Sequence, residues 1–595
     1  MLRPRLHERA LLAVGTMAFS LFTVAAVMMP AATRYRADLY GALSPLGWVA
    51  FAIAVICGCL IIFTSIRRGS RYWLSGTTVM MGSYAVFFWL PVARGYVLFA
   101  TPLSDSLIHL GIVRDVLSSG SIPDVIYPAS HLLIALLASI TDIKLTLFQP
   151  LVGYLFTLLL VLGILVSARR LLRSHTAGLY ALLAGLPLLY ASYHVVILPW
   201  FYTLTMFPII LYVADRWLTD RGDHRPYVML FVFMTAIAFY HPMMCLLIAG
   251  LLVSYWGYLR LESWVPGQMD LSRRSVGPLV FLLLFPLAVI TQWHLGLPRM
   301  QSRIGTILLA FQQGDQSAAS FAGQAGQTSY TVSELLWEYL VLRWGPTVVY
   351  MGVGGLLLLA VCYRIWHRRT TIADRRIAAL YLASFMTAIA ALVVLRTRNP
   401  VRAVRFVLLI VVYLIALAFW NRHRIDSKLE RWDSRVIVHS LLAIIVVVAL
   451  LASGITYRGD AHLTETTIDG TTWHLEHQNG ESITLAHRMA RNIDIYQDGY
   501  REGRFNERVF TRYNATHQLP KHLGYDENET IATTLSDRRY LVTKYSDTQW
   551  YRSQPRSRYS ELLFYNRSDA AALADDPAAN RLYNNGDFDV WLAGG

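Results

Sequence analysis

Residues 45–68 read PLGWVAFAIAVICGCLIIFTSIRR, an apolar run without charges that is closed by Arg67 and Arg68. At 1.5 Å per residue, such a run is long enough to cross the roughly 30 Å hydrocarbon core of a bilayer as one α-helix. Paired arginines directly after the run are typical of a loop that stays in the cytoplasm. The stretch therefore predicts a transmembrane helix with a defined orientation.

Comparable apolar runs recur along most of the chain. They lie near 9–30, 45–66, 73–93, 145–167, 176–194, 199–215, 227–240, 243–259, 277–293, 346–363, 377–395, 403–420 and 435–456. We therefore predict an all-α polytopic membrane protein with about 13 spans in residues 1–456. Arginines gather in every second loop on the side of the N-terminus, which places the N-terminus in the cytoplasm and leaves two long loops, 94–144 and 294–345, outside.

Composition agrees with a membrane class. The 595 residues are 55% hydrophobic and only 15% charged, and the mean hydropathy is +0.42. After Tyr457 there are 16 Lys and Arg against 20 Asp and Glu, a net charge of −4. Because the whole chain carries +15, residues 1–457 carry +19. The basic excess belongs to the loops of the membrane part, which favours a bilayer as partner and argues against nucleic acid.

Residues 457–595 are predicted to form a soluble extracytoplasmic domain of mixed α/β structure. Residues 539–543 read as a strand, and Asn585-Gly586 marks a turn before a final strand. The three Asn-x-Ser/Thr sequons of the chain, at Asn514, Asn528 and Asn566, all fall here, as an outside domain allows. The domain contains no cysteine, so no disulfide framework holds it.

The first outer loop carries the strongest functional signal. We expect Ser104 to cap a helix over 105–119, with Asp105 and His109 on the same face as Val116 and turned toward protein or lipid. A carboxylate buried there without a compensating partner would cost at least about 2 kcal/mol of desolvation free energy. This cost favours a functional Asp105 over a plain N-terminal cap, while His109 reads equally as its partner or as a satisfied loop residue.

The loop continues with Tyr127-Pro128, His131, and an apolar stretch over 129–142 that is too short to cross a bilayer and suits an interfacial helix. A span follows and ends in Ala168-Arg-Arg-Leu171. This order resembles the GT-C glycosyltransferases, membrane enzymes that take a sugar from a polyprenyl-phosphate carrier. The resemblance covers residues 73–260 well and 346–456 loosely. It implies that the acid of the first outer loop is catalytic and that arginines at the outer ends of spans bind the carrier phosphate.

The chain departs from two branches of that family. Protein O-mannosyltransferase-like members carry two adjacent acids in this loop, whereas Asp105 is followed by Ser106, which leaves Asp115 and Asp124 as candidate second acids or as solvated residues. Oligosaccharyltransferase catalytic subunits carry a Trp-Trp-Asp motif that is absent here. A transferase that uses a single lipid-linked sugar, like the aminoarabinose transferases, is therefore favoured over one that moves a whole oligosaccharide.

A second signal is the run of arginines at the predicted outer end of 403–420. Arg398, Arg402 and Arg405 contradict the rule that positive charge stays inside. Either the topology slips by one span, or Arg402 and Arg405, three residues apart on one helix face, clamp the carrier phosphate. The regular alternation of the flanking loops favours the clamp.

Further polar residues fall at the same predicted depth, in outer turns or loops. They are possible substrate contacts, although interfacial belt residues and solvated charges are the ordinary alternatives: His109, Tyr127, His131, His194, His241, Glu334 and Glu338.

We therefore predict an inverting glycosyltransferase of the cell surface. The carboxylate of Asp105 would accept a proton from, or orient, an acceptor hydroxyl on a glycan, a protein or a lipid. No cofactor is required because the leaving phosphate is already a stable anion, and no ligand spacing indicates a divalent metal. The alternatives are a transporter or lipid flippase, and a non-catalytic cell-surface assembly protein.

Overall fold

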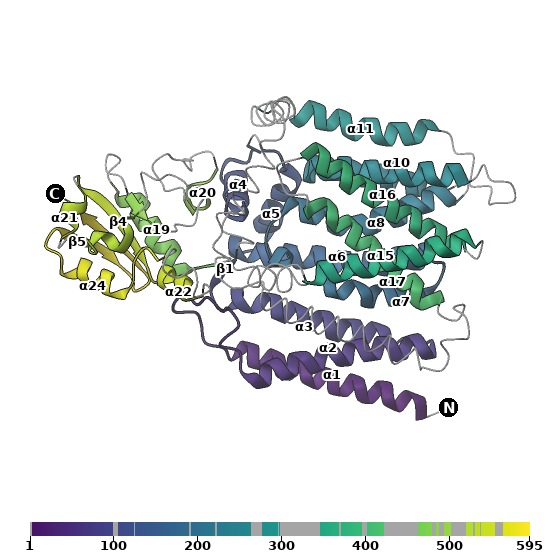
Figure 1. Ribbon diagram of the computed structural model, residues 1–595, viewed down its shortest axis with the longest axis horizontal. Coiled ribbons are helices and arrows are strands. Elements are labelled where there is room, and N and C mark those ends of the chain that lie inside the picture. Colours follow the sequence, from purple (N-terminus) through teal and green to yellow (C-terminus); the bar gives the residue numbers. More distant parts are fainter. Residues whose placement is uncertain are drawn as a thin grey trace.

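The computed structural model describes residues 3–98, 105–123, 125–189, 192–220, 223–262, 276–294, 297, 345–367, 371–395, 401–421, 462–478, 484–486, 493–500, 519–527, 530–535, 537–553 and 563–594. A bundle of helices carries the C-terminal domain at one end, and the N-terminus lies at the other (Figure 1). We call these the domain end and the N-terminal end of the bundle.

The bundle is built from long apolar helices. Within the described residues, six helices are long and apolar enough to cross a membrane, and four more are apolar but shorter. Large apolar side chains such as Met17, Leu356 and Leu359 are about two-thirds exposed. Contact of such side chains with water is unfavourable, whereas contact with lipid chains is not. The protein is therefore a multi-pass membrane protein, and the predicted run 435–456 lies outside the described residues. The bounds of the helices are α1 Arg3–Val27, α2 Pro45–Arg68, α3 Trp73–Ala93, α6 Phe148–Leu171, α8 Pro199–Thr219, α9 Arg225–Tyr240, α10 Pro242–Glu262, α11 Val276–His294, α15 Gly345–Trp366, α16 Ile372–Leu395 and α17 Val401–Asn421.

One predicted span is broken. In place of a helix over 176–194, α7 covers only His175–Gly185, and two 3₁₀ turns follow at Leu186–Leu188 and Ser192–Val195. Pro187 lies in the first of these turns, where its missing N–H prevents α7 from continuing. The described part of 186–198 is largely buried, and irregular backbone at this depth is possible because protein rather than lipid surrounds it.

Two short helices lie at the domain end (Figure 1). α4 spans Ser106–Ser119 and ends at Gly120, whose φ of 64° closes the helix as predicted. α5 spans Pro128–Ile140, too short to cross a bilayer. Its Leu136 and Ile140 are more than half exposed, in agreement with an interfacial helix.

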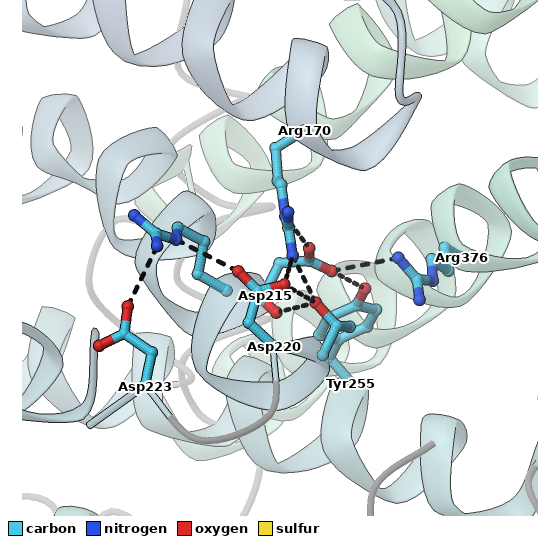
Figure 2. Close-up of polar contacts among 8 residues, drawn as sticks. Arg170, Asp215, Asp220, Asp223, Tyr255 and Arg376 are labelled. Atoms are coloured by element: carbon cyan, nitrogen blue, oxygen red, sulfur yellow. Dashed lines mark hydrogen bonds and ion pairs between the residues drawn. The ribbon is translucent and has the colours of Figure 1, made fainter. Parts of the chain in front are cut away.

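An ion network holds the N-terminal end of the bundle together (Figure 2). Asp215 of α8, fully buried, accepts hydrogen bonds from Arg170 Nε at 3.0 Å, Tyr255 Oη at 3.2 Å and Arg376 Nη1 at 3.5 Å. These partners come from α6, α10 and α16. Toward the surface the network continues through Asp220 to Arg216. One buried carboxylate therefore joins four helices.

The C-terminal domain is a four-stranded mixed sheet with helices against it. The strand order is β3-β4-β6-β5, with β3 parallel to β4 and the other pairs antiparallel. The predicted strand at 539–543 is β4, and the predicted turn joins β5 to β6 with Gly586 at φ 90°. The bounds are β3 Thr484–Ala486, β4 Arg539–Lys544, β5 Ala579–Asn584, β6 Phe588–Ala593, α19 Glu465–His477, α20 Ile493–Asp498, α21 Ile531–Thr534, α22 Tyr545–Ser553 and α24 Arg567–Asp575.

A two-stranded ladder joins the domain to the membrane part. β1, Tyr96–Leu98, follows α3 and pairs antiparallel with β2, His462–Thr464. The His462 ring stacks on Tyr35 with centroids 4.5 Å apart, and its Nε2 lies 2.9 Å from the Arg36 carbonyl oxygen. Asp587 accepts a hydrogen bond from the Tyr35 amide at 3.2 Å, so this carboxylate, which reads in the sequence as part of a turn, also fixes the junction.

The ladder should loosen in acid. Burial lowers the pKa of His462 to about 3, whereas an unfolded His titrates near 6.5. Because the folded state keeps the ring neutral, its contribution to stability is complete above pH of about 6.5 and falls as the pH drops toward about 3. We expect amide hydrogen exchange in β1 and β2 to accelerate over this range. The His462→Gln variant, which keeps a donor for the Arg36 carbonyl but does not titrate, should show a flatter pH dependence; equal slopes would contradict the assignment.

Candidate active site

α4 begins at Ser106, one residue later than predicted, and Asp105 lies directly before it. Asp105 is the N-cap residue with φ −80° and ψ 11°, its side chain makes no capping hydrogen bond, and it is exposed. The carboxylate is not held against protein as expected, because the helix starts at the buried Ser106 and Asp105 precedes its first turn, so the desolvation cost of burial against protein does not arise for Asp105. Ser104, the expected cap, lies outside the described residues. An accessible carboxylate can meet an incoming acceptor.

One turn into α4, His109 is buried and joins the helix to α5. Its Nδ1 lies 2.9 Å from Nε2 of His131, which is fully buried. Burial lowers the pKa of His109 to about 4, against the opposing effect of the Asp105 carboxylate. Both rings are then neutral near pH 7, and one donates while the other accepts. The imidazole pair fixes α4 against α5 one helical turn after Asp105.

Tyr127 connects this pair to the turn between α9 and α10. Its ring lies edge-on to His109 at 6.1 Å and stacks on His241 at 4.8 Å between centroids. His241, also buried, accepts a hydrogen bond at Nδ1 from the Met244 amide at 3.3 Å, at the start of α10. We call His109, Tyr127, His131 and His241 the imidazole cluster. The sequence nominated each of these four residues separately, and the structure brings them together.

Arg405 belongs to a second group at the same end. α16 and α17 run antiparallel, and Asn421 donates to Asp374 at the N-terminal end at 3.0 Å, so Arg405 near the start of α17 lies at the domain end. Its guanidinium lies 4.7 Å from the centroid of the Tyr193 ring, a distance suited to a cation–π contact. The structure thus places Arg405 at the domain end of the bundle, the end at which Asp105 lies.

His194 lies beside Arg405 in the broken crossing. Its Nδ1 is 2.8 Å from Thr157 Oγ1 of α6, and its ring stacks on Phe88 at 5.6 Å. Close approach to α6 depends on Gly153, because a Cβ there would sit 2.5 Å from the His194 carbonyl oxygen. We call Tyr193, His194 and Arg405 the arginine group.

The two groups meet through α6. Phe156 stacks on Tyr202 with centroids 4.3 Å apart and lies edge-on to Tyr240, the residue before His241, at 6.0 Å. The next residue, Thr157, contacts His194. α6 therefore contacts the arginine group through Thr157 and packs, through Phe156, against the residue that precedes His241 of the imidazole cluster. Tyr193, Phe156 and Thr157 carry no signal in the sequence, where they read as ordinary residues of apolar segments.

The remaining candidates are not part of this arrangement. Asp115 is buried, but its carboxylate accepts a hydrogen bond from the Tyr500 amide at 2.9 Å and so contacts the C-terminal domain. The side chain of Arg402, one turn before Arg405, lies outside the described residues, as do Asp124, Glu334, Glu338 and Arg398 entirely. In the part of the chain that the structure describes, no three His, Cys, Asp or Glu side chains are grouped to hold a metal ion.

Comparison with known proteins gives similarity only at the level of solved structures. No protein-family model and no curated protein matches the chain. ArnT from Cupriavidus metallidurans bound to undecaprenyl phosphate is similar at 13% identity and a TM-score of 0.48, over 87% of this chain and 98% of that one. The oligosaccharyltransferase of Archaeoglobus fulgidus in complex with zinc and sulfate is similar at 13% identity and a TM-score of 0.39, over 84% of this chain and 70% of that one. At these values the similarity assigns a role to no residue.

Proposed function

We propose that this chain is an inverting glycosyltransferase of the GT-C type. It transfers a monosaccharide from a polyprenyl-phosphate carrier to a glycan, protein or lipid acceptor on the outer face of the membrane. In this assignment the N-terminus is cytoplasmic, the domain end of the bundle faces outward, and the product belongs to the cell surface. No metal is required by the proposed chemistry.

The observation that carries the proposal is the placement of opposite chemistry at one end of the bundle. Asp105 is accessible at the start of α4, and Arg405 is held against Tyr193 at the start of α17. At the same end Tyr127 stacks on His241, and Phe156 packs edge-on against the neighbouring Tyr240. A cation at the outer ends of spans is unusual. Such a cation would bind the anionic phosphate headgroup of a lipid carrier at the membrane surface.

The reaction follows from these positions. The acceptor hydroxyl attacks the anomeric carbon while Asp105 takes or orients its proton. The new glycosidic bond forms as the bond between that carbon and the phosphate oxygen breaks, and attack from the opposite face inverts the configuration. The electron pair leaves with the polyprenyl phosphate, whose growing negative charge meets the guanidinium of Arg405. The buried imidazole pair keeps α4 in place during this step.

Sugar transfer by the purified full chain tests the proposal. The protein in lipid nanodiscs is given radiolabelled polyprenyl-phosphate monosaccharides and a membrane extract as the source of acceptors. We expect label to move into acceptor and free polyprenyl phosphate to appear in equal amount. Movement of intact carrier across the bilayer without cleavage would instead identify a flippase. If neither transfer nor movement occurred, a non-catalytic assembly protein would be the remaining alternative.

Arg405 should control the use of the donor. A charge-assisted hydrogen bond to phosphate contributes about 1.5–3 kcal/mol, so Arg405→Gln should lower kcat/KM for the donor by about 10- to 100-fold. Arg405→Lys keeps the charge but loses the planar fork, and we expect an intermediate loss. The measurement is the initial transfer rate against donor concentration. Equal rates for the wild type and Arg405→Gln would remove Arg405 from the donor site.

A further inference from the structure

The helix that Asp105 precedes, α4, has a face that lies against the C-terminal domain. A Cβ added at Gly111 of α4 would sit 2.2 Å from the Ile495 carbonyl oxygen and 2.8 Å from its Cγ2. Only glycine allows the backbone of α20 to approach this closely. The two helices, distant in sequence, therefore pack in direct backbone contact at the middle of α4.

Asp115, one turn further along α4, anchors the end of α20. The side chain is 6% exposed, and its Oδ2 accepts the Tyr500 amide at 2.9 Å. Gly499 adopts φ 86°, and a Cβ there would lie 2.0 Å from Asp115 Oδ1. The turn after α20 is therefore shaped around this carboxylate, which satisfies a backbone donor that the end of α20 leaves open.

The contact continues into the body of the domain. Arg114 donates to the Gln497 carbonyl oxygen and lies 5.0 Å from the centroid of the Tyr496 ring. The Gln497 side-chain amide in turn donates to Thr472 Oγ1 of α19 at 2.6 Å. α19 begins directly after β2, the strand of the ladder. A displacement of the domain would therefore be transmitted to α4.

We propose that the C-terminal domain positions the catalytic helix, with Asp115 as the positioning residue. The proposal rests on the proposed function, since it concerns the placement of Asp105. Asp115 follows Asp105 by ten residues, about 15 Å along the axis of α4, so the hold on Asp115 sets the position of Asp105. A misplacement of about 1 Å at a reacting group costs about 100-fold in rate.

Three variants of the full chain test this. Asp115→Ala removes the acceptor of the Tyr500 amide and should lower kcat by about 10- to 100-fold with little change in the donor KM. Asp115→Asn keeps an oxygen that accepts this hydrogen bond and should retain activity within about 3-fold. Gly111→Ala forces α4 away from Ile495 without removing a polar group, and we expect a loss of kcat similar to that of Asp115→Ala.

Lys144→Ala is the matched control. Lys144 pairs with Glu465, which is a further contact between the membrane part and the domain, and both side chains are about half exposed. An exposed ion pair contributes little, and kcat should stay unchanged. Hydrogen exchange of 106–119 and 493–500 confirms for each variant that the two helices are folded, and faster exchange in 106–119 is expected only for Asp115→Ala and Gly111→Ala.

The outcomes separate the two proposals. A wild type that transfers no sugar overturns the proposed function and this inference with it. An active wild type with undiminished kcat in Asp115→Ala overturns the positioning role alone, and so does equal loss in Asp115→Ala and Asp115→Asn. Loss in Asp115→Ala and Gly111→Ala with retention in Asp115→Asn supports it.

Discussion

Replacing Asp105 with Asn is expected to lower the rate of sugar transfer by about 100- to 10,000-fold, the range that general acid–base groups contribute. The amide has the shape of the carboxylate but cannot take the proton of the acceptor hydroxyl. Because Asp105 is exposed and makes no capping hydrogen bond, the stability of the fold should change by less than about 0.5 kcal/mol. The measurement is kcat with saturating donor, together with expression and thermal unfolding.

Asp142→Asn provides the control for this substitution. Asp142 is also an exposed acid of the first outer loop and lies just after α5, outside the imidazole cluster and the arginine group. Its variant should transfer sugar at the wild-type rate. If Asp105→Asn kept full turnover as well, Asp105 would have no part in the chemistry.

The second large effect concerns stability rather than turnover. Asp215→Ala removes the carboxylate that faces Arg376, whose side chain is only 2% exposed. Within the described residues Nε and Nη2 of Arg376 have no hydrogen-bond partner, so the variant would leave a buried cation without a counter-ion. Removal of one partner of a buried ion pair costs about 3–5 kcal/mol. We expect a marked fall in the temperature at which the purified protein unfolds in detergent.

Asp223→Ala is the comparison for this loss. Asp223 accepts from Arg216 at 3.2 Å, and both side chains are about one-third exposed. The pair should contribute less than about 1 kcal/mol, and the unfolding temperature should hardly move. Equal shifts in the two variants would mean that Asp215 does not hold the four helices together.

The membrane part was predictable because span length and apolar character are direct properties of the sequence. α3 begins and ends where the run 73–93 does. The break in the crossing at 176–194 was missed although Pro187 lies at it, because prolines also stand inside the intact helices α3, α8 and α11, and apolar residues look the same in an intact helix and in a buried broken one. The predicted start of α4 was one residue too early, and this shift moved Asp105 from a face of the helix to an exposed position before it.

The site itself was predictable only in parts. His109, Tyr127 and His241 were separate predictions at a common depth, and their contact depends on how α4, the start of α5 and the turn between α9 and α10 pack. Asp215 was overlooked, although a lone acid inside an apolar run is a signal of its own. Its partners Arg170 and Arg376 stand in other helices, and nothing local pairs them with it.

The ladder of β1 and β2 has a consequence for biosynthesis. β1 emerges from the ribosome near residue 98 and waits for a partner that begins at residue 462. At translation rates of about 5–20 residues per second, this delay lasts tens of seconds. During that time every span in between must be inserted while one strand edge stays open to wrong partners. The ladder can therefore form only after the spans between β1 and β2 have been synthesised, and a paired ladder marks a molecule whose insertion is complete.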